Sequence, residues 1–258
     1  AGATRNIRVM TGIVIAPLYD PVLLAKTVTT VDVVSGGRLD FGIGISGQRG
    51  TKIEFDAVGV PVRTRGKRTD EMLNVMKRLW TEEKVSHHGD FFDFDDVTLT
   101  PTPTQSPHPP IWVAGRSEAA MRRAAVLGDG WYPYLFTVRR LKASNEMISQ
   151  YAAEAGRDMR NFHWGLNQPT SIGEDRDKAF AVAVENVGER YVTRERTAED
   201  IAQALCVSGT PQDCIKAIED RVEAGVRDFN FGFLSPDLSG LFNQMELFSS
   251  QVIPHFRS

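Results

Sequence analysis

The chain has 258 residues, enough for one large domain or two small ones. Its residues are 41% hydrophobic and 24% charged, which allows a substantial core and argues against disorder. The 30 basic and 33 acidic residues give a net charge of −3, so neither a nucleic acid nor an anionic membrane is an expected partner. We see no apolar run long enough to span a bilayer and no secretion signal, and we therefore expect a cytoplasmic protein.

Strands and helices alternate along the chain, a pattern that favours a parallel sheet. Six core strands are expected, near residues 7, 39, 111, 131, 163 and 229. Helices are expected over residues 22–34, 67–80, 117–127, 138–155, 174–191, 198–206, 211–225 and within 238–253. Residues 46–64 are rich in glycine and are expected to form a loop, and residues 82–110 an excursion with a small hairpin and a proline-rich segment.

The alternation predicts an α/β fold of the TIM (β/α)8 type. A complete barrel of this kind has eight βα units in about 250 residues, and here the excursion takes up part of the length. Six of the eight units are visible, so the barrel is expected to be incomplete at its N-terminus. We interpret residues 1–258 as a single barrel domain of this shortened kind.

The run Ser35–Gly44 contains a turn, a short strand and a glycine-rich strand end. Such a strand end brings backbone close to whatever lies beyond it, and in parallel α/β proteins ligands bind beyond the strand ends. The run therefore predicts a cofactor or substrate pocket.

Two cysteines, Cys206 and Cys214, lie in or beside a predicted helical region. Neither has the neighbouring ligands of a metal site or the paired base of a catalytic thiol, so both are expected to be free thiols.

Several short motifs, taken in order, resemble those of the luciferase-like monooxygenase superfamily. They are Thr11-Gly12-Ile13, Asp20-Pro21-Val22-Leu23-Leu24-Ala25-Lys26, Ser35-Gly36-Gly37-Arg38-Leu39, Gly42-Ile43-Gly44, Pro109-Pro110-Ile111-Trp112-Val113-Ala114-Gly115, Gly128-Asp129-Gly130-Trp131 and Gly209-Thr210-Pro211. The resemblance implies a TIM barrel that binds FMN or the deazaflavin coenzyme F420. The Ser-Gly-Gly-Arg and Gly-Asp-Gly-Trp motifs are most similar to those of F420-dependent oxidoreductases. F420 is therefore the expected coenzyme, with FMN as the alternative.

The resemblance also implies two further βα units before the strand at Ile7, and Ala1–Thr4 looks like the tail of the second helix. These two units have no counterpart in the sequence. The chain is a fragment, or its preceding residues are missing from the sequence, or the barrel is naturally shortened. Open edges and the resemblance both favour a homodimer.

Three segments are candidate coenzyme contacts. Thr11, Gly12 and Ile13 match a family position where a non-prolyl cis peptide supports the ring system, although a bulge glycine would look the same. Gly44, Ile45, Ser46 and Gly47 offer amides and a hydroxyl to the ring edge, or form only a tight turn. Ala114, Gly115, Arg116 and Ser117 join a strand end, a basic side chain and a helix start, which suits a phosphate; a simple cap by Ser117 is the alternative.

The remaining candidates concern substrate and metal. Trp131, Tyr132 and His163 are candidates for the substrate pocket, and each is also compatible with a structural role. The histidines and aspartates of residues 87–96 fit no standard metal spacing and predict a solvated loop, so no metal is expected.

No triad, carboxylate pair or nucleophile elbow stands out, and no catalytic residue is assigned. This suits an enzyme whose coenzyme carries the chemistry. We therefore expect hydride transfer between F420 and a small organic substrate. An FMN-dependent monooxygenase with a separate reductase and a non-catalytic shortened barrel that acts as a binding or assembly module are the alternatives.

Overall fold

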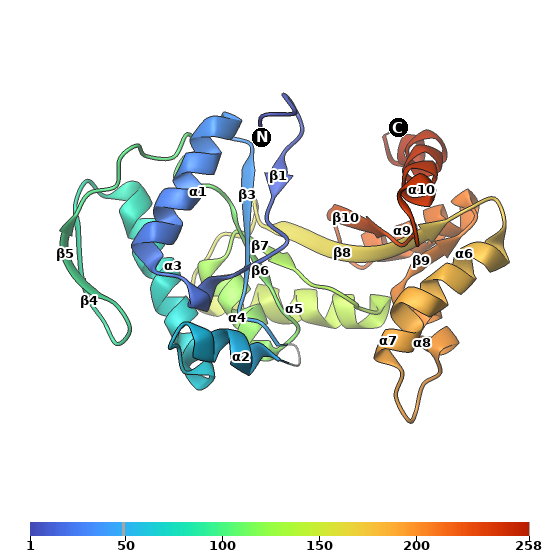
Figure 1. The fold of residues 1–258 in the computed structure, drawn as a ribbon, viewed down its shortest axis with the longest axis horizontal. Coiled ribbons are helices and arrows are strands. Elements are labelled where there is room, and N and C mark those ends of the chain that lie inside the picture. Colours follow the sequence, from blue (N-terminus) through green and yellow to red (C-terminus); the bar gives the residue numbers. More distant parts are fainter. Residues whose placement is uncertain (48–49, 258) are drawn as a thin grey trace. The chain divides into compact units, whose positions relative to one another are not determined.

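The computed structural model describes residues 1–47 and 50–257 (Figure 1). The chain forms two compact units. The first comprises Ala1–Tyr132 with Ile148–Phe162, and the second comprises Pro133–Met147 with the chain from His163 onward. Each unit contains its own parallel strands with helices between them, as the sequence predicts.

The first unit is built on a parallel sheet in which β3 is central. Its strands are β1 (Val9–Met10), β2 (Val14–Ile15), β3 (Leu39–Gly44), β6 (Ile111–Ala114) and β7 (Gly130–Tyr132). Both β1 and β2 pair with one edge of β3, and β6 lies between β3 and β7. The single strand predicted near residue 7 is thus two short strands, interrupted where the Gly12–Ile13 peptide bond is cis.

Helices cover this sheet and follow the strands in order. They are α1 (Pro21–Ser35), α2 (Thr51–Ala57), α3 (Arg65–Thr81), α4 (Glu118–Leu127) and the later part of α5 (Val138–Glu154), with short 3-10 turns at Ala16–Leu18 and Val62–Thr64. Asp20 caps α1 by accepting hydrogen bonds from the amides of Val22 and Leu23 at 2.9 and 3.1 Å, and Pro21 follows as the first helical residue.

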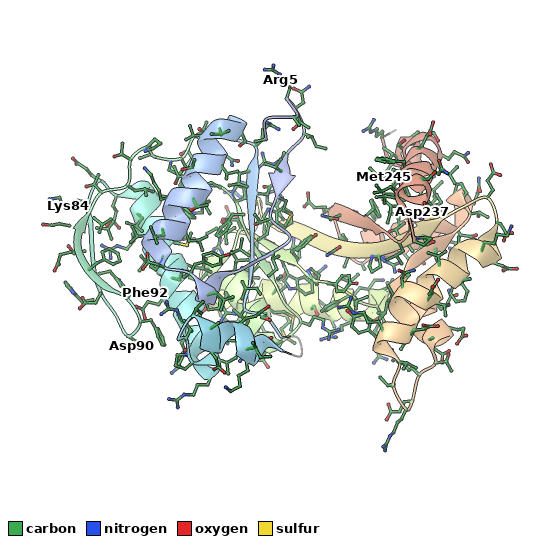
Figure 2. The ribbon with its side chains drawn as sticks, in the orientation of Figure 1. Arg5, Lys84, Asp90, Phe92, Asp237 and Met245 are labelled. Carbon is green, nitrogen blue, oxygen red and sulfur yellow. The ribbon has the colours of Figure 1, made fainter. Side chains whose placement is uncertain are left out.

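The excursion of residues 82–110 forms an antiparallel hairpin followed by a proline-rich segment. The hairpin strands are β4 (Val85–His88) and β5 (Asp93–Val97), and Asp90 lies at the tip (Figure 2). The carboxylate of Glu71, on α3, accepts hydrogen bonds from the amides of Phe91 and Phe92 and so fixes the hairpin. The buried carboxylate of Asp32, on α1, does the same for the proline-rich part, where it accepts from the amide of Thr104 at 2.7 Å.

The second unit contains the long strand β8 (His163–Ile172). It pairs in parallel with β10 (Asp228–Phe233) from Gly165 to Thr170, and with β9 (Val207–Gly209) at its carboxyl end. The other elements are α6 (Arg176–Ala183), a π-helical turn (Val184–Gly188), α7 (Glu189–Tyr191), α8 (Ala198–Leu205), α9 (Pro211–Glu223), α10 (Leu238–Gln251) and a 3-10 turn (Ile253–Phe256). Figure 2 marks α10 by the side chain of Met245.

Three predictions of local structure need correction. The loop predicted at residues 46–64 contains α2, which buries Phe55 completely; its two large apolar residues, Ile53 and Phe55, are two positions apart, and this spacing gives no helical period. The helix predicted over residues 174–191 is interrupted by the π-helical turn after Ala183. The strand β9 was not expected, because three residues between two helices are too few to show an alternating pattern.

Among the described residues, no helix has the length and apolar character needed to cross a membrane, and no group of potential ligands is arranged to hold a metal ion.

The two cysteines are free and buried, and we predict that neither reacts in the folded protein. Burial raises the pKa of both thiols, Cys206 and Cys214, to about 12, so almost no thiolate exists at neutral pH. A thiol reagent such as DTNB should modify neither cysteine before unfolding and both in denaturant. Rapid labelling of either residue in the native protein would contradict this.

The carboxylate of Asp213 is predicted to make stability depend on acidic pH. A hydrogen bond from Arg176 is the largest cause that lowers its pKa from 3.8 to about 2, and the capping hydrogen bonds from Thr210 add to it. Because the folded pKa lies below the unfolded one, the stabilisation is complete above about pH 4 and is lost as the pH falls toward 2. Asp213→Asn should lower the free energy of unfolding by about 1 kcal/mol at pH 7, after allowance for solvent screening. Thermal unfolding from pH 7 to 2 checks this, since the gap between variant and wild type should close at the acid end.

Candidate functional site

The candidate site lies at the carboxyl ends of the strands in the first unit. Ala114 pairs with Tyr132, and Ile15 pairs with Gly44. A Cβ atom placed on Gly44 would lie 3.8 Å from the Cβ of Ala114, so Gly44, Ala114 and Tyr132 form one row on one face of the sheet. Two of the three are glycine and alanine, which leaves backbone rather than side chains along this row.

The segment Thr11–Ile13 crosses the same face and is fixed to β3. The Thr11 hydroxyl donates to the carbonyl of Gly42 at 2.9 Å and accepts from the Gly42 amide at 2.8 Å. The approach is so close that a Cβ on Gly42 would lie 2.0 Å from the Thr11 carbonyl oxygen. Only glycine fits there, which is why the glycine-rich strand end is needed for local packing as well as for any ligand.

Gly12 is exposed, and of the described residues only Tyr132 lies near the position of its missing side chain. A Cβ atom built on it would meet only the phenol of Tyr132, with the hydroxyl oxygen 3.7 Å away. Tyr132 is buried, and its ring packs edge-on against Trp112. Burial raises the pKa of the Tyr132 phenol to about 12, so the group stays protonated and acts as a hydrogen-bond donor.

The segment Gly44–Gly47 continues from β3 beside Ile13. A Cβ on Gly44 would lie 2.6 Å from the Cδ1 atom of Ile13, which shows how closely the two segments pack. Ser46 has a positive φ of 59°, and its hydroxyl lies 2.7 Å from that of Thr51. The Ser46 hydroxyl thus already has a hydrogen-bond partner within the protein. It would bind a ligand only together with the Thr51 hydroxyl, or in place of that partner.

The segment Ala114–Ser117 joins β6 to α4. Gly115 has a φ of 137°, and a Cβ there would lie 2.6 Å from the Cβ of Ala120, so the turn depends on glycine. The indole nitrogen of Trp131 donates to the Gly115 carbonyl at 3.1 Å and fixes the turn. Ser117 caps α4 by accepting from the Ala120 amide at 3.2 Å.

The Ser117 cap leaves other backbone amides at the start of α4 available to a ligand. The first amides of α4 have no partner within the helix, and the helix dipole favours an anion there. Arg116 is exposed beside them and adds a full positive charge. The nearby carboxylate of Glu118 accepts a 2.6 Å hydrogen bond from the Tyr151 hydroxyl, which ties it to α5.

The role of His163 in a substrate pocket stays a prediction. This histidine belongs to the second unit, is the first residue of β8, and lies 3.4 Å from the Asp228 carboxylate. Ligands of parallel α/β folds bind at the carboxyl ends of strands, and this is an amino end. We therefore leave His163 out of the proposed site.

Sequence reasoning missed Trp112 and Gly42 as parts of the site. Trp112 supports the Tyr132 ring, and Gly42 receives the crossing segment. A signal for Trp112 was present, because it lies two residues before Ala114 and therefore on the same face of the strand.

The chain belongs to the luciferase-like monooxygenase family, whose model matches residues 1–228. It is 33% identical over 190 residues to the FMNH(2)-dependent dimethylsulfone monooxygenase of Pseudomonas putida, a match that covers 72% of this chain and 50% of that protein. The crystal structure of monooxygenase RslO1 from Streptomyces bottropensis superposes with a TM-score of 0.80 at 26% identity, over 99% of this chain and 80% of that one. This likeness confirms the expected fold class.

An F420-dependent secondary alcohol dehydrogenase, solved with an F420-acetone adduct, has the same fold. Its TM-score is 0.82 at 24% identity, and the match covers 97% of this chain and 80% of that one. The chain spans half or less of the length of the first curated relatives it matches, namely 50%, 32% and 38% of them.

Proposed function

We propose that the chain carries the coenzyme site of an oxidoreductase that uses a flavin or deazaflavin to transform a small organic substrate. The observation that carries this proposal is the row of Gly44, Ala114 and Tyr132. The small residues of this row and the nearby Gly12 leave room for a ligand close to the first turn of α4. A flat ring system with a phosphate-bearing side chain suits such an arrangement. Several of the relatives that match are named monooxygenases, which favours this over a non-catalytic module.

The residues present fit the two parts of such a coenzyme. Thr11–Ile13 and Gly44–Gly47 would contact the ring, and Ala114–Ser117 with the first turn of α4 would hold the phosphate. When bound, the coenzyme would supply the hydride or oxygen chemistry. The protein's part is to bind and orient the ring, to neutralise the phosphate with Arg116, and to cover one side of the site with the buried rings of Trp112 and Tyr132.

F420 is the coenzyme we propose first, with hydride transfer as the reaction. The Ser-Gly-Gly-Arg and Gly-Asp-Gly-Trp segments support it, and the F420-dependent dehydrogenase shows that this fold accommodates F420. FMN is the second candidate, because the relative with 33% identity is an FMNH(2)-dependent monooxygenase.

Titration of the purified protein with F420 and, separately, with FMN tests the proposal by coenzyme fluorescence. We expect binding of one of them at micromolar concentration. Arg116→Gln should weaken FMN or F420 binding about tenfold and leave riboflavin, which lacks the phosphate, unaffected. Arg160→Gln is the matched control, since Arg160 is an exposed arginine of the same unit that pairs with Asp158. Binding of neither coenzyme would overturn the proposal.

The whole protein is proposed to be a cytoplasmic homodimer. The two unbridged cysteines support a reducing compartment. The exposed face of α1 supports self-association, because Leu23 and Val34 are 69% and 68% exposed and Lys26 is the one charged residue on that face. Light scattering on wild type and Val34→Glu tests this; a monomeric wild type would exclude the dimer.

A further inference from the structure

The side chain of Tyr132 is buried, but its hydroxyl makes no hydrogen bond within the part of the protein that the structure describes. Only 5% of the residue is exposed. The hydroxyl is not one of the fully buried polar atoms that lack a partner, so it lies at the open edge of the buried ring, where water or a ligand can reach it. The neighbouring Trp131, by contrast, donates its indole N–H to the carbonyl of Gly115.

The direction of the phenol is fixed by its surroundings. Tyr132 is the last residue of β7, paired with Ala114, and its ring is held edge-on against Trp112 at a centroid distance of 6.3 Å. Its hydroxyl lies beside Gly12, where a Cβ atom would come within 3.7 Å of it and of no other residue. The donor therefore faces the open space that the glycine leaves.

The chemistry of the donor restricts its partner. With a pKa raised to about 12 by burial, the phenol is neutral at all physiological pH values. A neutral phenol beside uncharged backbone suits an uncharged acceptor such as a ring carbonyl better than a cation.

We infer that the Tyr132 hydroxyl donates a hydrogen bond to a carbonyl oxygen on the ring system of the bound coenzyme, beside Gly12. The inference rests on the proposed function and adds to it a residue that positions the ring. It assigns Tyr132 a binding role toward the coenzyme rather than a place in the lining of a substrate pocket.

Tyr132→Phe is the deciding variant, because it removes one oxygen atom that makes no hydrogen bond with a described residue. We expect unchanged thermal stability without coenzyme, an affinity for F420 or FMN about three- to tenfold weaker, and a shifted visible absorption band of the bound coenzyme. Tyr134→Phe is the control: Tyr134 is two residues further on, its phenol pKa is also raised to about 12, and it belongs to the second unit. It should change neither affinity nor spectrum.

A second variant, Gly12→Ala, tests the position independently of Tyr132. It places a methyl group beside the Tyr132 hydroxyl, where it clashes with no residue that the structure describes, and it should weaken coenzyme binding while stability is kept. If Tyr132→Phe binds with wild-type affinity and spectrum, or if Gly12→Ala binds as wild type does, the inference is overturned while the proposed function stands. Failure of the wild type to bind either coenzyme overturns both.

Discussion

Gly42→Ala is expected to lower the free energy of unfolding by about 3–5 kcal/mol, the largest effect we predict for a single methyl group in this chain. The added Cβ would lie 2.0 Å from the carbonyl oxygen of Thr11 and 3.3 Å from a methyl group of Ile13. The first contact is with backbone, which cannot rotate away. Relief requires that the crossing segment move off β3, and this breaks both hydrogen bonds between Thr11 and Gly42.

Urea unfolding of Gly42→Ala against Gly47→Ala measures this effect. A Cβ on Gly47 has no atom of the described residues within 4 Å, so that variant should stay within about 0.5 kcal/mol of wild type. Thr11→Val separates the two contributions, because it removes the hydroxyl without adding bulk near β3 and should cost about 1–3 kcal/mol. A Gly42→Ala protein as stable as wild type would mean that Thr11 and Gly42 do not approach as the structure shows.

The Gly42 contact also shows what could be read from the sequence and what could not. The glycine-rich strand end, the Asp20–Pro21 helix start and the Ser117 cap are local patterns, and each was predictable because its partners lie within a few residues. The close approach of Thr11 to Gly42 joins residues 31 apart. A pattern of neighbouring residues cannot reveal a contact between positions so far apart in the chain. The glycines of this strand end therefore predicted a pocket, whereas the structure shows that Gly42 is needed to let Thr11 pack against β3.

In the candidate site, too, some features could be predicted from the sequence and others could not. Strand ends at Gly44 and Ala114 were predictable because the carboxyl ends of parallel strands share one edge. The hydrogen-bond partners of the side chains were not predictable. The hydroxyl of Ser46 pairs with that of Thr51, whereas the hydroxyl of Tyr132 makes no hydrogen bond with a described residue. The role of His163 stays a prediction, because an apolar run marks a strand but gives its boundaries poorly, and this histidine is the first residue of β8.

Asp70→Ala is expected to destabilise the protein by about 3 kcal/mol, more than Arg123→Met, although the two side chains form one ion pair. Arg123, on α4, is 4% exposed and contacts both carboxylate oxygens of Asp70, on α3, as well as the carbonyl of Gly66 at 3.1 Å. Asp70 is 44% exposed. Removal of Asp70 leaves a buried guanidinium without its counter-ion, whereas removal of Arg123 leaves a carboxylate that water can reach.

The double variant Arg123→Met with Asp70→Ala completes the comparison. We expect it to be about as stable as Arg123→Met alone, because once the buried charge is gone the exposed carboxylate contributes little. Urea unfolding of the four proteins in 0.1 and 1 M salt measures this, and the coupling energy should be nearly independent of salt, since a buried pair is poorly screened. The exposed pair Arg160–Asp158 is the control, with a coupling below about 1 kcal/mol that salt abolishes. Equal losses for the two single variants would instead mean that water reaches Arg123, and that α4 is not held against α3 by a buried charge.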